Sequence, residues 1–256
     1  MIDTVLKDDW ELKQTIALGT VAVVCLMLCG LFGHRWAMHG SGSQRRLVEQ
    51  LQKRGILKSE RVIFTMLATD RALYTDRSPY TDAPQPIGHK ATISAPHMHA
   101  YTLELLADKL TDGASILDVG SGSGFLTACF ARMVGSTGRV VGVEHLWRLV
   151  QRSTENVRRD DPNLLSNGCL RFVLGDGVLG WAEGAPYDAI HVGAAACKVP
   201  PKLVEQLSHG GRLLVPIGCP GRAQWLTQVD KKPDGSVSSR KITTVTFVPL
   251  TEGRHS

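Results

Sequence analysis

Residues 116–127 read Ile-Leu-Asp-Val-Gly-Ser-Gly-Ser-Gly-Phe-Leu-Thr and constrain the fold of this chain more than any other stretch. The apolar run at its start predicts a buried strand, and the stretch Phe125–Val134 predicts a helix. Between them, glycines at alternate positions, Gly120, Gly122 and Gly124, predict a tight turn. A strand, a glycine-rich turn and a helix let a ligand lie against bare backbone at a helix N-terminus.

The spacing of these glycines does not match the usual dinucleotide turn. That turn needs Gly-x-Gly-x-x-Gly, and the sixth position counted from Gly120 is Phe125. An acid, Asp118, stands at the strand end just before the first glycine, where it would repel a pyrophosphate and attract an ammonium group. S-adenosylmethionine joins a nucleoside to an amino-acid head without phosphate, so the turn favours this cofactor. A plain strand-to-helix turn is the alternative.

Two further acids follow later predicted strands. Residues 139–144 read as a second strand ending in Glu144, at the distance where parallel sheets use an acid to accept both ribose hydroxyls. Residues 170–174 read as a third strand, and Asp176 and Gly177 after it suit an adenine amino group and the adenine ring. Each acid alone also fits a solvated loop. Together they would line one crevice at the edge of an open sheet.

Strands and helices alternate along most of the chain. We predict helices at 44–54, 60–67, 125–134, 146–158 and 200–207, and strands at 116–119, 139–143, 170–174, 186–193 and 212–216. Residues 224–230 and 242–248 flank a turn signal and predict a final hairpin. The predicted fold class is α/β, a doubly wound, mostly parallel sheet of the Rossmann-like S-adenosylmethionine-dependent methyltransferase type, with a C-terminal antiparallel hairpin.

The N-terminal segment, residues 1–40, differs from the rest. Residues 14–33 carry no charge, and as a helix they would span roughly 30 Å, the thickness of a bilayer core. The residues before them lack the basic start of a secretory signal. We predict a single membrane anchor at 14–33 and a catalytic domain at 41–256 facing the cytosol. A cleaved signal, a helix that packs on a partner, and a soluble cytoplasmic chain are the alternatives.

Composition limits the kinds of partner and ligand that we expect for this chain. The net charge of +5 is too mild and dispersed to indicate nucleic-acid binding. The six cysteines show no Cys-x-x-Cys pair, so we interpret them as free thiols of a reducing compartment rather than a disulfide framework or a zinc site. His97 and His99 would point apart on a helix, so no metal is expected. We expect the chain to act as a monomer.

Two stretches concern the place where the acceptor of the methyl group would bind. After the fourth strand, Gly193–Ala196 offers no metal ligand and lacks the Asn/Asp-Pro-Pro-Tyr motif of amine methylases. These small residues either leave a wide cleft with exposed backbone that accepts an extended polypeptide, or allow close packing. Ser94, followed by Ala-Pro, either caps a helix or places its hydroxyl beside the reacting centre.

Four segments together resemble one known family. They cover residues 91–101, 118–124, 175–177 and 187–196, the first of which contains Thr-Ile-Ser-Ala-Pro-His. From residue 43 to about 251 the sequence resembles the protein-L-isoaspartate (D-aspartate) O-methyltransferases. These enzymes methylate the abnormal carboxylate of L-isoaspartyl residues and so begin the repair of aged proteins. The resemblance implies an enzyme that uses S-adenosyl-L-methionine and acts on polypeptides bearing isoaspartyl or D-aspartyl residues.

The resemblance also implies roles for single residues. Ser94 would be the active-site serine. Asp118 would hold the methionine end of the cofactor, Glu144 its ribose, and Asp176 with Gly177 its adenine. The implied cofactor-binding set is Ala91, Thr92, Ile93, Ser94, His99, Asp118, Gly120, Gly122, Glu144, Asp176, Gly177 and Thr251. The competing interpretation is a membrane-tethered module that binds S-adenosylmethionine or damaged peptides without turnover.

Overall fold

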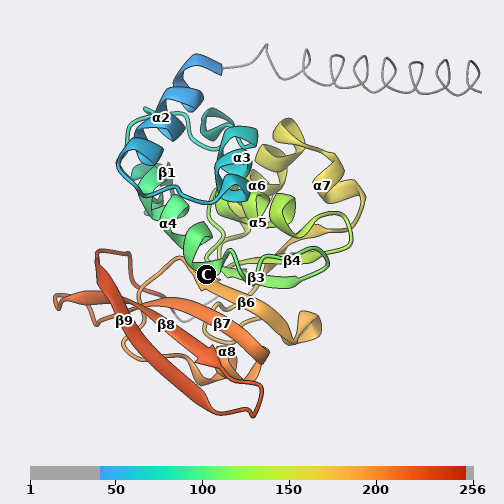
Figure 1. Ribbon diagram of the computed structural model, residues 1–256, viewed down its shortest axis with the longest axis vertical. Helices are drawn as coiled ribbons and strands as arrows, with labels where there is room; N and C mark the ends of the chain where they lie inside the picture. The colour runs from blue at the N-terminus through green and yellow to red at the C-terminus, as the bar shows by residue number, and fades with distance from the viewer. Residues whose placement is uncertain (1–40, 252–256) are drawn as a thin grey trace, which may run out of the picture. The chain divides into compact units, whose positions relative to one another are not determined.

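A seven-stranded sheet organises residues 41–251, the part of the chain that the computed structural model describes (Figure 1). Its strand order is β5-β4-β3-β6-β7-β8-β9. The strands are β3 Ser115–Val119, β4 Arg139–Glu144, β5 Leu170–Leu174, β6 Tyr187–Val192, β7 Leu207–Ile217, β8 Gln224–Lys231 and β9 Val237–Val245. The first five in the order are parallel, and β8 and β9 add antiparallel strands at one edge. The predicted fold class is confirmed.

Helices cover both faces of this sheet, most of them on one side (Figure 1). They are α2 Ser41–Lys53, α3 Glu60–Ala68, α4 Pro96–Leu106, α5 Phe125–Val134, α6 Trp147–Asp160, α7 Asn163–Ser166 and α8 Pro201–Glu205, with short turns η1 Arg71–Leu73 and η2 Ala182–Gly184. A small antiparallel pair, β1 Gln85–Gly88 and β2 Ala91–Ile93, precedes α4. The predicted helix at 125–134 coincides with α5. The predicted helix at 200–207 is shorter, since residue 207 already begins β7.

Alternate residues of the central strands pack into two separate hydrophobic layers. Ile116 of β3 lies in the layer with α2 to α6, whereas Leu117 and Val119 lie in the layer with α8. All three are fully buried. The period of two that a strand imposes on its side chains therefore explains why β3 is apolar at both faces.

The order of the strands creates a switch point beside β3. The chain runs from β3 outward through β4 to β5, then returns to β6 on the opposite side of β3. The loops after β3 and β6 therefore leave the sheet in opposite directions, which opens a crevice at the carboxyl ends of these strands. The two loops start in contact, since the amide of Gly193 donates to the carbonyl of Val119 at 2.8 Å.

The second strand of the C-terminal hairpin has other bounds than predicted. The strand predicted at 242–248 begins earlier, at Val237, and ends at Val245. Residues 246–250 therefore leave the sheet. The amide of Ala195 donates to Val248 and the amide of Leu250 donates to Ala195, both at 2.8 Å, so this C-terminal segment runs along the loop after β6.

The cysteine prediction is wrong for one pair. Cys197 and Cys219 form a disulfide, with their Cα atoms 4.5 Å apart, within the normal range. Ala196 and Ile217 pair in a parallel bridge just before each cysteine, so two positions 22 residues apart in sequence become neighbours. Composition could not reveal this proximity. Cys129 and Cys169 are buried free thiols.

Residues 1–40 and 252–256 lie outside the described residues, and so does the predicted anchor at 14–33. No helix within residues 41–251 is long and apolar enough to cross a bilayer. From Ser43 onward the described chain forms one compact unit.

Candidate active site

The three acids predicted as cofactor ligands lie at neighbouring strand ends. Asp118 is in β3, Glu144 ends β4, and Asp176 follows β5. Because β3 pairs with β4 and β4 pairs with β5 in parallel register, their carboxyl ends meet at one edge of the sheet. The structure therefore brings the Asp118–Gly124 loop and the other two acids to the crevice beside the switch point.

The glycine loop requires glycine by conformation, and at Gly124 also by space. Gly120, Gly122 and Gly124 have φ of +76°, +54° and +84°, a region that side chains of L-residues disfavour. A Cβ on Gly124 would also lie 2.9 Å from Phe172 and 3.0 Å from Ser153. The loop therefore presents main chain directly in front of the α5 N-terminus.

Glu144 anchors this loop to β4. Its Oε2 accepts the amide of Gly122 at 3.1 Å, and its Oε1 accepts the amides of His145 at 2.8 Å and Leu146 at 3.2 Å. The residue is buried. Because a carboxylate oxygen has two lone pairs, Oε2 retains acceptor capacity beside the loop, as a ribose ligand requires.

Asp118 is more deeply buried than its predicted role suggests. Only 1% of its surface is exposed. Its Oδ2 accepts the Thr127 hydroxyl at 2.6 Å, and its Oδ1 contacts the Nδ1 of His191 at 2.8 Å. Asp118 thus ties β3 to α5 and β6. Its role at the methionine end of the cofactor stays a prediction, and the remaining lone pairs of the carboxylate are compatible with it.

The C-terminal segment reaches the third strand end. A Cβ on Gly177 would lie 2.6 Å from the Cγ1 of Val119 and 3.3 Å from the Cδ1 of Leu250. Thr251, predicted to close the cofactor site, is exposed and directly follows Leu250. The Oδ1 of Asp176 accepts the Val178 amide at 2.8 Å, which fixes the turn after β5.

The small residues after β6, Gly193–Ala196, are only partly accessible to a ligand. Ala194 and Ala195 are 7% and 5% exposed. Their backbone is used inside the protein, because Ala195 bonds to the C-terminal segment and the amide of Ala196 donates to Pro216 at 3.0 Å. The predicted cleft with exposed backbone is therefore wrong for these alanines, and close packing explains them. Gly193 does line a pocket.

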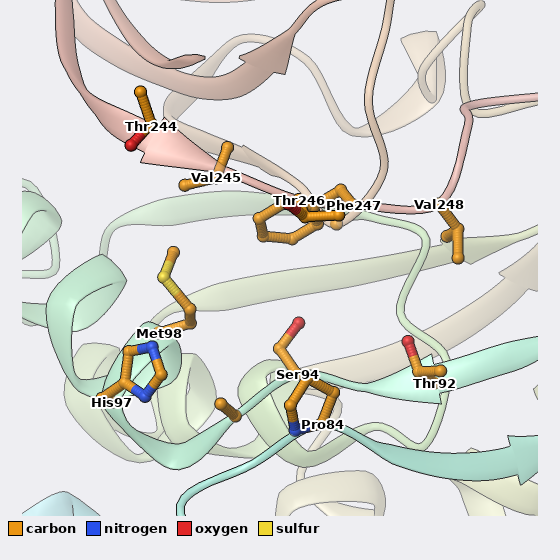
Figure 2. A pocket seen from close by; sticks show the side chains of 12 residues that line it. Pro84, Thr92, Ser94, His97, Met98, Thr244, Val245, Thr246, Phe247 and Val248 are labelled. Carbon is orange, nitrogen blue, oxygen red and sulfur yellow. The ribbon is translucent and has the colours of Figure 1, made fainter. Parts of the chain in front are cut away.

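That pocket has a volume of about 590 Å³ and adjoins the switch point. Its lining residues are Pro84, Thr92, Ser94, Ala95, His97, Met98, Gly193, Thr244, Val245, Thr246, Phe247 and Val248. Figure 2 shows the hydroxyl of Ser94 pointing toward the segment that carries Thr246 and Phe247. The sequence pattern predicts a hairpin strand for residues 244–248 and gives no sign of this role, since nothing in an edge-strand pattern indicates that the strand will leave the sheet.

Ser94 does not cap α4. The N-cap is Ala95, Pro96 opens the helix, and no side chain makes a capping hydrogen bond. The capping interpretation of Ser94 is therefore wrong. Within the described residues no group lies at hydrogen-bond distance from its hydroxyl, which is left to the pocket.

The two histidines of α4 have different partners. His97 contacts Asp82 twice, through its amide at 2.9 Å and its Nδ1 at 2.8 Å, and Arg54 pairs with the same carboxylate. Burial raises the pKa of Asp82, but these hydrogen bonds outweigh it and hold the pKa below its usual value. His99, predicted to border the cofactor, is buried against Phe125, with ring centroids 4.8 Å apart.

Comparison with known proteins decides the family. Residues 42–255 match the family model described as protein-L-isoaspartate(D-aspartate) O-methyltransferase. The chain belongs to the protein-L-isoaspartate (D-aspartate) O-methyltransferase family. The resemblance found in the sequence motifs is thus confirmed, and so is the S-adenosylmethionine dependence that it implies.

Relatives in this family cover nearly all of the described chain. A protein-L-isoaspartate O-methyltransferase of Triticum aestivum is 52% identical over 219 residues, which are 84% of this chain and 94% of the relative. That of Caenorhabditis elegans is 44% identical over 216 residues, 84% and 95% of the two chains. A Plasmodium falciparum chain assigned to the same activity, solved with S-adenosyl-L-homocysteine, superposes with a TM-score of 0.76 at 38% identity, covering 81% of this chain and 98% of its own.

The site fits the cofactor of this family. Gly120, Gly122 and Gly124 present main chain in left-handed turns, the buried Ser121 hydroxyl has no partner among the described residues, and Glu144 keeps an acceptor position beside the loop. These features suit a ligand that lies against main chain and offers hydroxyl and amino donors.

Proposed function

We propose that this chain methylates the free carboxylate of L-isoaspartyl and D-aspartyl residues in damaged proteins and peptides, which begins their repair. The observation that carries the proposal is the pocket beside the glycine loop. It holds the Ser94 hydroxyl together with the hydroxyls of Thr92, Thr244 and Thr246, and no Asp or Glu is among its lining residues. Hydroxyl donors without a competing negative charge suit a carboxylate ligand.

The chemistry that the pocket must perform is modest. A carboxyl group of this kind has a reference pKa near ~3.9 and is already ionised at neutral pH, so no general base is needed. When bound, S-adenosylmethionine supplies an electrophilic methyl group on a positively charged sulfonium. Ser94 donates a hydrogen bond that orients the acceptor carboxylate, and the segment 244–248 shields it from water.

The cofactor-binding set that we propose follows the sheet edge and the strand before α4. Gly120 and Gly122 present main chain, Asp118 and Glu144 accept the methionine end and the ribose, and Asp176 with Gly177 faces the adenine. Ala91, Thr92, Ile93, Ser94, His99 and Thr251 complete the set. Support comes from the junction between β2 and α4, which holds Ser94, and from Leu250, which packs near Gly177.

A pair of peptides tests the activity. The full chain is incubated with S-adenosylmethionine labelled on the methyl group and two peptides that differ only in aspartate or isoaspartate at one position. Base-labile label in the isoaspartyl peptide alone is the expected result. Label in neither peptide, with cofactor still bound, would favour a binding module without turnover and overturn the proposal.

A Ser94→Ala variant tests the role of the hydroxyl. We expect turnover to fall by about 10- to 100-fold, because an unoriented carboxylate loses in-line geometry, while cofactor affinity measured by calorimetry stays near the wild-type value. Thr244→Val, which removes another hydroxyl of the same pocket, is the matched control and should cost less. Equal loss of turnover and cofactor affinity in Ser94→Ala would contradict an orienting role.

We further propose that residues 14–33 tether the enzyme to a membrane as a single span, with a monomeric catalytic domain facing the cytosol. The charge-free composition of this stretch supports the proposal. Carbonate extraction of membranes from cells expressing the full chain should leave it in the pellet. Recovery in the supernatant would contradict the tether, and light scattering in detergent checks the monomer.

A further inference from the structure

Arg71 is a deeply buried cation. It opens the turn η1, its exposed fraction is 0%, and it is among the largest fully buried side chains of the described residues. No carboxylate within residues 41–251 forms an ion pair with it. Burial of an unpaired charge is costly, so a guanidinium persists in such a place only where its hydrogen bonds are needed.

The hydrogen bonds of Arg71 lead to the active site. One terminal nitrogen donates to the carbonyl of Ser94 at 2.8 Å, and the other contacts the Nδ1 of His99 at 3.3 Å. The guanidinium carbon lies 5.7 Å from the centre of the Phe125 ring, the first residue of α5 after the glycine loop. One side chain therefore joins the serine, the histidine predicted to border the cofactor, and the helix behind the glycine loop.

The contact with His99 fixes the position of a proton. A guanidinium has donors and no acceptor, so the Nδ1 of His99 must accept in this contact. The ring is then neutral, with its hydrogen on Nε2. Burial lowers the pKa of His99, and the nearby charge of Arg71 lowers it further, so both effects favour the neutral ring.

The position of Arg71 is itself well fixed. The Oε1 of Gln44 in α2 accepts the Arg71 amide at 3.4 Å, and the amide nitrogen of the same Gln44 side chain donates to Met66 at 2.6 Å and Thr69 at 3.1 Å. Gln44 is buried. Helix α2 thus holds the start of η1, and η1 holds the guanidinium against the β2–α4 junction.

We propose that Arg71 is a positioning residue for methyl transfer, which holds the Ser94 main chain in place and keeps His99 as a neutral ring that donates from Nε2. The inference rests on the proposed function, because it assigns Arg71 to the machinery of Ser94 and His99. The planar guanidinium of Arg71, with its donors in fixed directions, matters as well as its charge. Lysine keeps the charge but cannot reproduce two bonds in fixed directions.

The test compares two Arg→Lys variants of the full chain with the wild type. Arg71→Lys should lower kcat/KM for an isoaspartyl peptide by about 10- to 100-fold, with S-adenosyl-L-homocysteine binding also weakened. Arg61→Lys is the matched control. Arg61 also donates to main-chain carbonyls, those of Leu110 and Met133, but it lies outside the pocket lining, and its kcat/KM should stay near wild type.

A second readout does not depend on activity. Nuclear magnetic resonance of isotopically labelled histidine, with the His99 signals assigned by their loss in His99→Gln, should show the Nε2–H tautomer in the wild type. In Arg71→Met we expect a mixture of tautomers. Nδ1–H in the wild type would overturn the proposal, as would unchanged kcat/KM in Arg71→Lys with only a lower melting temperature. A wild-type chain that methylates no isoaspartyl peptide would refute the proposed function. The tautomer measurement would still decide whether Arg71 fixes which ring nitrogen of His99 carries the hydrogen.

Discussion

Gly177 allows a sharp test of how the loop after β5 packs against the end of β3. Its φ lies outside the left-handed region, so alanine there introduces no backbone strain and acts only through its Cβ. That atom would lie 2.6 Å from the Cγ1 of Val119, a fully buried side chain with a stiff branch at Cβ. Overpacking of this kind costs about 1–3 kcal/mol, so we expect Gly177→Ala to lower the free energy of unfolding by this amount.

A double-mutant cycle isolates the contact. Val119→Ala alone should cost about 2 kcal/mol, since it empties part of the buried layer. In the double variant the nearest remaining atom of residue 119 is its Cβ, 4.0 Å from the new methyl group, which is ordinary contact. The cost of Gly177→Ala should therefore shrink in the Val119→Ala background by about 1–2 kcal/mol.

Urea unfolding followed by circular dichroism measures all four free energies. Gly175→Ala is the matched control from the same loop, because its Cβ would meet Val143 at 3.3 Å and Trp181 at 3.6 Å and should cost less than about 1 kcal/mol. Additive costs for Val119→Ala and Gly177→Ala, within about 0.5 kcal/mol, would refute the reasoning that these two positions exclude each other's side chains.

Two further predictions concern stability. The Cys197–Cys219 disulfide closes a loop with a sequence separation of 22, so Cys197→Ser should lower the free energy of unfolding, measured in urea, by about 3 kcal/mol. Added reductant should lower the stability of the wild type but not that of this variant. If both thiols can be alkylated in the untreated wild type, the disulfide is contradicted. The pKa of Asp82 is held below its usual value when folded, so its contribution to stability is present above about pH 4 and is lost as the pH falls through the folded pKa. Asp82→Asn should therefore show a flatter loss of stability on acidification, measured by thermal unfolding across a pH series, and a profile parallel to that of the wild type would contradict the assignment.

Local sequence signals predicted the central part of the fold well. Residues 116–119, 125–134 and 170–174 became strand, helix and strand because their apolar patterns agree with the layers on both faces of the sheet. The same patterns place the three acids at one sheet edge, since parallel strands bring their carboxyl ends together, and their role toward the cofactor stays a prediction. Ser94, singled out by its motif, lines the pocket, although the capping explanation offered for it proved wrong.

The features that sequence reasoning missed all depend on contacts between distant segments. Cys197 meets Cys219 only because their strands pair, and Thr246 lines the pocket only because β9 ends early. Arg71 gave no signal, since a basic residue in a loop rich in Pro, Asp and Tyr indicates a solvated surface rather than a buried cation. Propensity and periodicity report on the nearest turns of chain, and none of these contacts is local.

The C-terminal segment links the two halves of the proposed reaction. Thr246, Phe247 and Val248 line the pocket for the acceptor, while Leu250, two residues later, packs toward Gly177 at the proposed adenine end. Its backbone is held between them by two hydrogen bonds to Ala195. Because five consecutive residues contribute to both regions, a shift that admits a polypeptide at one end moves atoms at the other. Acceptor and cofactor affinities should therefore be coupled through this segment, and by linkage each ligand must change the affinity of the other by the same factor.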